Sequence, residues 1–333
     1  MTATQAAQTP AKSHIPVLLN EVVSALKPQV GEVYVDGTFG AGGYARAVLN
    51  AADCTVIGVD RDPDAIKRSV AFVDEFGPRF RICEGRFGDM VALLAEIGID
   101  AVDGVMLDIG VSSFQLDEAE RGFSFREDGP LDMRMSSEGE TAADVVNTYE
   151  ETDLANIIYK YGEERKSRRI ASAIVRRRAE APFERTLDLA KLIESVLGRP
   201  PVKKGRKATH PATRTFQALR IYVNDEMGEL ERGLAAAEAL LRKDGRLVVV
   251  SFHSLEDRLV KNFMAERSGR LPAASRHMPM SMDAAQPASF RLETRGVVKP
   301  SAEEEAVNPR ARSSKLRAAV RTSAPIWKEP AHA

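Results

Sequence analysis

The sequence predicts an α/β protein whose parallel, doubly wound sheet is interrupted by a helical insertion. Between residues 33 and 110, short β-branched runs alternate with longer stretches of helical spacing, which is typical of parallel strands joined by crossover helices. Residues 114–213 contain almost no strand-like run, and the apolar run 246–252 then restores the earlier pattern. The sheet domain is therefore expected to be discontinuous in sequence.

The individual elements follow from the same patterns. Strands are expected at 33–36, 55–60, 80–84, 104–108 and 246–252. Helices are expected at 43–51, 63–76, 89–97, 151–161, 163–178, 187–197, 211–241 and 254–265. The second of these helices has Asp62 as its capping residue and Pro63 in its first turn, which is a common helix start.

The length of the chain supports this organisation. A chain of 333 residues exceeds the usual single-domain size, and 44% hydrophobic residues with a net charge of −1 are typical of a globular protein. We expect a sheet domain in two parts, 1–115 and 213–321, around a helical substrate-recognition domain at 116–212, with a loose tail at 322–333.

Two features indicate a cytoplasmic protein. Only two cysteines occur, Cys54 and Cys83, each in an apolar strand-like run, which fits a reducing compartment and predicts two buried thiols. No stretch approaches the roughly 18 apolar residues that span a bilayer, and residues 1–12 lack the apolar core of a signal peptide. No membrane partner is expected.

The near-zero net charge hides a strong asymmetry within the insertion. Residues 110–155 contain 12 acidic and 3 basic side chains, net −9, whereas residues 160–214 contain 16 basic and 6 acidic ones, net +10. A local positive excess is the footprint expected of a phosphate-backbone partner. Two mutually neutralising solvated faces would give the same counts.

A glycine-rich loop follows the first predicted strand. The run DGTFGAGG at 36–43 places four glycines in seven residues between a strand and a helix. Glycine allows a positive φ and a close approach of the backbone to a ligand, and the helix start that follows offers free N–H groups. The segment 40–45 also fits a relaxed dinucleotide pattern, so a nicotinamide- or flavin-dependent oxidoreductase is the alternative.

The ends of the predicted strands favour a different cofactor. Asp60 can accept hydrogen bonds from both ribose hydroxyls of an adenosine, which suits either cofactor. Asp36 would repel a pyrophosphate but attract the positively charged amino-acid end of S-adenosylmethionine. Phe87 follows the third strand, where adenine could stack, and the fourth strand ends at Asp108. Ligands of open α/β sheets bind at this edge.

Nine longer motifs carry a resemblance to one family. They are HIPVLL (14–19), DGTFGAGG (36–43), DIGVSSFQLD (108–117), RGFSF (121–125), GPLDMRM (129–135), YGEE (161–164), THPATRTFQ (209–217), SFHSLED (251–257) and NPRAR (308–312). With these motifs the sequence resembles the bacterial 16S ribosomal RNA (cytosine-N4)-methyltransferase family from residue 14 to about residue 321. So many ordered matches are highly specific.

The resemblance implies a class I, Rossmann-like methyltransferase fold that methylates N4 of a cytidine in the ribosomal decoding centre. It implies S-adenosylmethionine as cofactor and 16S ribosomal RNA within the small ribosomal subunit as partner. Tyr44 stands where the family usually has histidine, and Phe114 where proline is frequent; a backbone contact at Tyr44 would survive the change. The implied cofactor contacts are Gly42, Gly43, Tyr44, Asp60, Phe87, Asp108 and Gln115.

Two residues are candidates for the catalytic proton acceptor. A cytosine amino group that attacks a methyl donor must lose a proton, which an acceptor in the site assists. Asp108 ends the fourth strand and His253 follows the fifth, both at the ligand-binding edge. His253 has RNA contact or a structural hydrogen bond as alternatives, and Ser254 and Asp257 are spaced as a capping box. No metal is expected.

The basic half of the insertion supplies the candidates for RNA contact. They are Arg168, Arg169, Lys203, Lys204, Arg206 and Lys207. Phe123, Phe125 and Phe216 are candidate stacking surfaces for a base, with core packing as the alternative. A homodimer is compatible with the sequence. An RNA-binding scaffold with a vestigial cofactor site is a further alternative, which the retained cofactor motifs disfavour.

Overall fold

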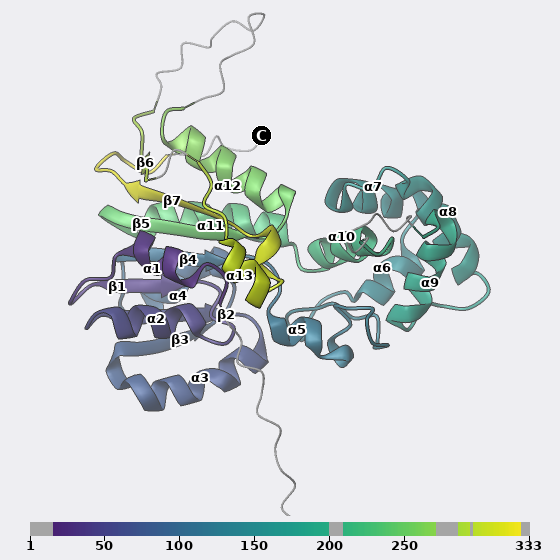
Figure 1. Ribbon diagram of the computed structural model, residues 1–333, viewed down its shortest axis with the longest axis horizontal. Helices are drawn as coiled ribbons and strands as arrows, with labels where there is room; N and C mark the ends of the chain where they lie inside the picture. The colour runs from purple at the N-terminus through teal and green to yellow at the C-terminus, as the bar shows by residue number, and fades with distance from the viewer. Residues whose placement is uncertain (1–15, 200–208, 271–285, 294–295, 328–333) are drawn as a thin grey trace, which may run out of the picture.

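A computed structural model describes residues 16–199, 209–270, 286–293 and 296–327. Seven strands form one sheet in the order β3-β2-β1-β4-β5-β7-β6 (Figure 1). The first five strands are parallel, and β7 runs antiparallel to β5 and β6. The strands are β1 Val33–Asp36, β2 Thr55–Asp60, β3 Phe80–Glu84, β4 Val102–Asp108, β5 Leu241–Ser251, β6 Phe290–Leu292 and β7 Lys315–Arg321. This arrangement confirms the predicted class I α/β fold.

The predicted strand bounds hold for β1, β2 and β3, and β4 is two residues longer than predicted. β5 begins at Leu241, five residues before the predicted start, because residues 242–245 form a bulge and not a separate turn. The pairing with β4 passes from Val102 opposite Leu241 to Gly104 opposite Arg246. β6 and β7 lie outside the predicted elements.

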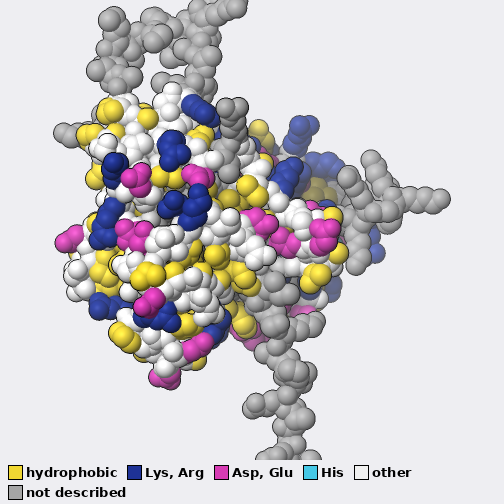
Figure 2. All heavy atoms as spheres, turned by 60° about the vertical axis from the view of Figure 1, so that its left-hand side comes forward, with side chains coloured by type: hydrophobic (Ala, Val, Ile, Leu, Met, Phe, Trp, Pro, Cys, Tyr) yellow, Lys and Arg dark blue, Asp and Glu magenta, His cyan; other side chains and the backbone are white. Residues whose placement is uncertain are grey.

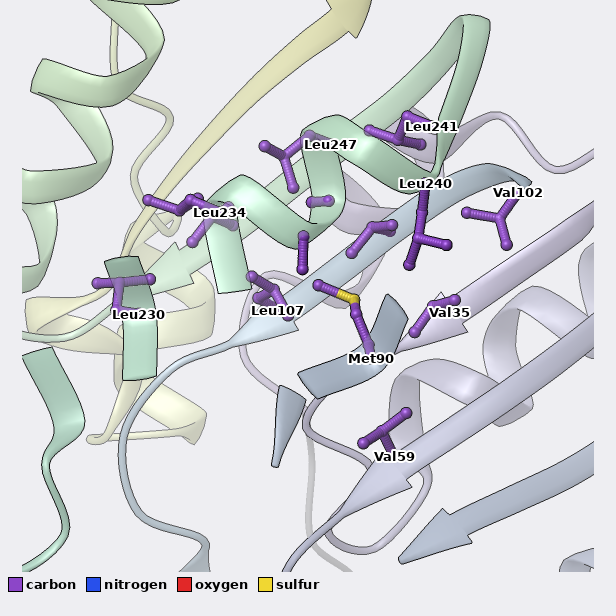
Figure 3. Packing of buried hydrophobic residues seen from close by; sticks show 14 of the residues in the cluster. Val35, Val59, Met90, Val102, Leu107, Leu230, Leu234, Leu240, Leu241 and Leu247 are labelled. Atoms are coloured by element: carbon purple, nitrogen blue, oxygen red, sulfur yellow. The ribbon is translucent and has the colours of Figure 1, made fainter. Parts of the chain in front are cut away.

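Helices cover both faces of the sheet, and each face has its own apolar core (Figure 1). The flanking helices are α1 Leu19–Leu26, α2 Gly43–Ala51, α3 Pro63–Phe76, α4 Met90–Glu96, α11 Glu226–Leu240, α12 Ser254–Arg267 and α13 Ala302–Val307. Strand residues alternate between the cores: Val35 packs with α4, α11 and α12 (Figure 3), whereas Tyr34 packs with α1, α2 and α3. Cys54 and Cys83 are buried free thiols, as predicted.

The insertion forms a separate helical body beside the sheet domain (Figure 1). Its helices are α5 Ser113–Asp117, α6 Ala142–Thr148, α7 Glu151–Gly162, α8 Ser167–Arg178, α9 Thr186–Leu197 and α10 Thr213–Val223. α10 lies beyond the predicted boundary at residue 212, yet Phe216 and Leu219 belong to the helical core. Phe123 is buried there too, and the ring of Phe125 lies 4.7 Å from that of Phe216. Core packing therefore accounts for all three phenylalanines.

The single helix predicted at 211–241 is wrong, because α10 and α11 are separated at Asn224 and Asp225. Asp225 has a left-handed φ of 50°. The buried Asn224 side chain accepts a hydrogen bond from the Met135 N–H (2.8 Å) and donates to the Met133 carbonyl (2.7 Å). The hydrogen bonds of Asn224 therefore connect the insertion to α11, the first helix of the sheet domain after the insertion. In the described parts of the chain, no helix is both long and apolar enough to cross a membrane.

We expect Asn224→Ala to lower the free energy of unfolding by about 2–3 kcal/mol, because it leaves buried backbone groups at Met133 and Met135 without partners. Chemical denaturation followed by circular dichroism measures this change. Asn50→Ala, at an exposed position of α2, is the matched control and should stay within about 0.5 kcal/mol of the wild type. Equal effects of the two substitutions would contradict a stabilising role of the Asn224 hydrogen bonds.

Candidate cofactor site

A cavity opens at the carboxyl edge of the parallel strands, where the loops after β1, β2, β3 and β4 converge. It encloses about 1200 Å³ free of protein atoms, including its open mouth. Gly42 lies between the lining residues Ala41 and Gly43 but does not itself line the cavity, contrary to the prediction. The other six predicted cofactor residues all line the cavity: Gly43, Tyr44, Asp60, Phe87, Asp108 and Gln115.

Glycine is required at two positions of the loop after β1. Gly42 has a φ of 73°, and a Cβ there would lie 2.3 Å from Cζ of Phe72. At Gly43 a Cβ would lie 2.2 Å from Cγ of Pro16. These close approaches hold the start of α2 against the cavity, where its first N–H groups are available to a ligand.

Asp60 and Phe87 form the part of the site suited to an adenosine. Asp60 Oδ2 accepts a hydrogen bond from the Gly40 N–H (2.7 Å) and Oδ1 from the Asp62 N–H (2.8 Å), which fixes the carboxylate between two loops. Each oxygen keeps a lone pair for a ribose hydroxyl. The Phe87 ring lies against Gly233 of α11, where a Cβ would approach it to 2.3 Å.

Asp108 and Tyr44 meet at the other side of the cavity. The Tyr44 hydroxyl donates to the carbonyl of Val17 and lies beside the Asp108 carboxyl group. Burial, and then the charges of Asp36 and Glu256, hold the pKa of Asp108 well above its usual range. Burial, and then the charge of Asp108, likewise raise the pKa of Tyr44. The Tyr44 side chain therefore takes part in the site, beyond the backbone contact expected of it.

Asp36 ends β1 as predicted, but it does not face the cavity. Its side chain is fully buried and does not line the cavity, so a direct contact with the amino-acid end of a cofactor is corrected. Asp36 instead lies at the end of β1, behind the wall. Burial, reinforced by the charge of Asp60, raises its pKa to about 7.

Gln115 connects the cavity to the insertion. Its Oε1 accepts from the Ser112 N–H (3.0 Å), which closes the capping box of α5, and its Nε2 donates to Asp62 Oδ2 (2.7 Å). Arg121 also binds Asp62 (3.1 Å) and donates to the Met135 carbonyl (3.1 Å). Asp62, the capping residue of α3, thus anchors two segments of the insertion.

His253 caps α12 and is not among the cavity-lining residues. Its Nδ1 accepts from the Glu256 N–H (3.3 Å), and its Nε2 lies 2.9 Å from Glu256 Oε1. The capping box therefore joins His253 to Glu256, one residue before the predicted pair of Ser254 and Asp257. Both ring nitrogens face the first turn of the helix.

Glu226, His253 and Glu256 offer ligand atoms within 4.8 Å of one another, a separation that suits a metal ion. The Arg220 guanidinium already neutralises one acid of this cluster, because it donates to both carboxylate oxygens of Glu226 (2.7 and 2.8 Å). The geometry therefore favours an internal charge network over a metal centre.

Several cavity residues were missed by the sequence reasoning. They are Arg61, Arg86, Glu226, Glu229 and Arg310. Arg61 and Arg86 directly follow or precede predicted residues, so their strand-end position was a usable signal. Arg310 comes from the far end of the chain and pairs with Asp117 of α5 (2.8 Å). Only the NPRAR motif pointed to it.

The predicted RNA contacts fall into two groups, one on α8 and one outside the described residues. Arg168 and Arg169 are exposed on α8, and Arg169 also donates to the Val196 carbonyl (3.2 Å). Other arginines of the helix serve the fold, since Arg177 pairs with Asp188. Lys203, Lys204, Arg206 and Lys207 lie outside the described residues. On the face of the sheet domain shown in Figure 2, both charge signs are interspersed.

The cavity fits an adenosine cofactor that carries a positive charge. One side offers a carboxylate for ribose and an aromatic ring, and the other offers Asp108, whose Oδ1 is buried without a partner. A sheet of this order with such a site defines a methyltransferase of the α/β class.

Comparison with known proteins places the chain within that class. A profile of the MraW methylase family matches residues 11–322, and the chain belongs to this family. It is 58% identical over 317 residues to ribosomal RNA small subunit methyltransferase H of Rhodospirillum rubrum, covering 94% of this chain and 96% of the relative. The protein of that name from Caulobacter vibrioides is 60% identical over 317 residues, with 95% and 98% covered.

We expect Gly42→Ala to lower the free energy of unfolding and weaken cofactor binding, because the new Cβ meets the Phe72 ring. Gly98→Ala is the matched control, since Gly98 has a φ of 77° with nothing within 4 Å of a Cβ. The control should cost about 1 kcal/mol from backbone strain, and Gly42→Ala about 1–3 kcal/mol more from the clash. Thermal unfolding and calorimetric titration with S-adenosylmethionine measure both effects; equal costs would contradict the close packing.

Proposed function

We propose that this methylase transfers a methyl group from S-adenosylmethionine to N4 of a cytidine in 16S ribosomal RNA within the small ribosomal subunit, in the cytoplasm. The observation that carries the proposal is the cavity, which combines Asp60 and Phe87 for an adenosine with an uncompensated acidic wall at Asp108. The relatives, named ribosomal RNA small subunit methyltransferases, support the substrate.

Different cavity residues bind the cofactor and accept the proton in the proposed reaction. When bound, the cofactor supplies an activated methyl group on a sulfonium. Gly43 and Asp60 would hold and orient it, and Phe87 would provide a surface for the adenine. The amino nitrogen of cytosine has a delocalised lone pair, so it must pyramidalise and lose a proton as it attacks. Asp108 is the proposed acceptor, because its buried Oδ1 has no partner and burial raises its pKa, which strengthens it as a base.

His253 is the weaker candidate for the acceptor because it does not line the cavity and its Nδ1 caps α12. Its proposed role is to fix the loop after β5, next to the cavity residue Phe252.

The insertion provides the RNA contacts in this proposal, through Arg168, Arg169 and the basic segment at 203–207. A nicotinamide-dependent oxidoreductase would instead show stabilisation by NAD and none by S-adenosylmethionine in thermal-shift measurements.

The decisive experiment is transfer of a tritiated methyl group to small subunits that lack the modification, followed by identification of the labelled nucleoside. N4-methylcytidine is the expected product. A different labelled nucleoside, or label on free RNA alone, would overturn the corresponding part of the proposal.

We expect Asp108→Asn to reduce kcat by about 10²–10⁴-fold at saturating cofactor, because the variant lacks the proton acceptor. Cofactor affinity is measured separately by calorimetry, since Asp108 also lines the cofactor cavity. His253→Asn is the control, because asparagine preserves a helix cap, and it should retain kcat within a few-fold. Unchanged methylation by Asp108→Asn would remove Asp108 as the base, and a comparable loss in His253→Asn would favour His253.

We expect the double variant Arg168→Glu, Arg169→Glu to bind small subunits more weakly, with a shallower dependence of affinity on salt. Each lost phosphate contact should reduce the slope of log K against log salt by about 0.9. A second variant reverses Lys203, Lys204, Arg206 and Lys207. Lys243→Glu with Lys261→Glu, on exposed positions of the sheet domain, is the charge-matched control. An unchanged slope in both insertion variants would refute the assignment.

A further inference from the structure

Two carboxyl groups project side by side from neighbouring strands at the cavity. β1 and β4 are parallel neighbours, and Asp36 is in register with Met106. Asp108 lies two residues beyond Met106, so its side chain leaves the same face of the sheet as that of Asp36. Thr38 links the two strand ends, because its N–H donates to Asp36 Oδ1 (3.2 Å) and its Oγ1 accepts from the backbone N–H of Asp108 (2.7 Å).

Each of these carboxyl groups keeps one buried oxygen without a partner. Within the described chain, Asp36 Oδ2 and Asp108 Oδ1 have no hydrogen-bond partner. The charged groups that act on the pair are all acidic, namely Asp60 from β2 and Glu256 from α12. The Tyr44 hydroxyl from α2 also faces Asp108, and Tyr44 in turn faces Glu304 from α13. Glu256 is itself next to His253.

A buried carboxylate without a counter-charge is strongly disfavoured, and two neighbouring ones titrate as a pair. The raised pKa values of both groups agree with this physical expectation. In the protein without ligand, the pair is therefore expected to hold a proton up to a higher pH than a solvated carboxyl group would. Only Asp108 lines the cavity, so Asp36 acts on the site through its neighbour.

We propose that Asp36 and Asp108 act as one unit, which releases a proton when a cationic ligand enters the cavity and takes a proton up when that positive charge is lost. Asp36 is the positioning residue of the unit and Asp108 is the member that faces the ligand. The inference rests on the proposed function, because the cation is the sulfonium of S-adenosylmethionine.

This coupling matches the balance of the proposed reaction. Methyl transfer breaks one carbon–sulfur bond, forms one carbon–nitrogen bond, leaves a neutral thioether and requires the amine to lose one proton. The pair is thus deprotonated while the sulfonium charge is present, and its affinity for a proton rises when that charge leaves sulfur. The same coupling distinguishes the charged cofactor from the neutral-sulfur product, which favours product release.

The test is calorimetric titration of the full-length protein at neutral pH in two buffers with different ionisation enthalpies. The difference in heat gives the number of protons released per ligand bound. We expect roughly one proton for S-adenosylmethionine and clearly less for S-adenosylhomocysteine. Both ligands carry the same amino and carboxylate groups, so the difference between them reports the sulfonium charge.

Proton release also predicts the pH dependence of binding in the unmodified protein. Because binding releases a proton, affinity for S-adenosylmethionine should fall by up to about tenfold per unit as pH drops below the titration of the pair, and level off above it. S-adenosylhomocysteine should show a weaker dependence. This measurement needs no variant.

Asp36→Asn removes one acid while keeping the side-chain volume. It should reduce the proton release, and it should move the acid limb of the kcat–pH profile to lower pH because Asp108 loses a neighbouring like charge. Asp74→Asn, exposed on α3, is the control and should change neither. Binding without proton release, or without pH dependence, overturns this inference alone. Absence of binding overturns the proposed cofactor, and the inference with it.

Discussion

Parallel strands end at the same edge of a sheet, and in this protein three of them bring a buried or half-buried acid to that edge. β1 ends at Asp36, β2 at Asp60 and β4 at Asp108. Backbone N–H groups stabilise Asp60, whereas Asp36 and Asp108 each keep an oxygen without a partner. The side of the site at Asp36 and Asp108 therefore favours a cation, and the preference for a sulfonium cofactor over a dinucleotide follows from these strand ends more than from the glycine loop.

The sheet domain was largely predictable because its signals are local. Short β-branched runs located β1, β2 and β3, and the pair Asp62 and Pro63 located the start of α3. The break between α10 and α11 was not predictable in this way. It depends on hydrogen bonds from Asn224 to Met133 and Met135, about ninety residues earlier in the chain, while the apolar spacing continues through it.

The sequence could predict which residues form the candidate site, but not how deeply each is buried or which of them touch. The resemblance identified six cavity-lining residues, yet sequence could not show that Asp36 lies behind the wall or that Tyr44 reaches Asp108. Whether a side chain at a strand end is exposed depends on the helix that packs over it. The ring orientation of His253 depends similarly on Glu256, whose role as the partner in the capping box appears only in three dimensions.

The contacts of Asp62 limit how the helical insertion can be exchanged between related enzymes. It caps α3 in the sheet domain and at the same time binds Gln115 and Arg121 of the segment that leads into the insertion. A helical insertion exchanged between two relatives would therefore have to bring along its contacts at Asp62 as well as those at Asn224. A chimaera joined only at the ends of the insertion would place a foreign helical body on a cofactor loop that no longer holds it.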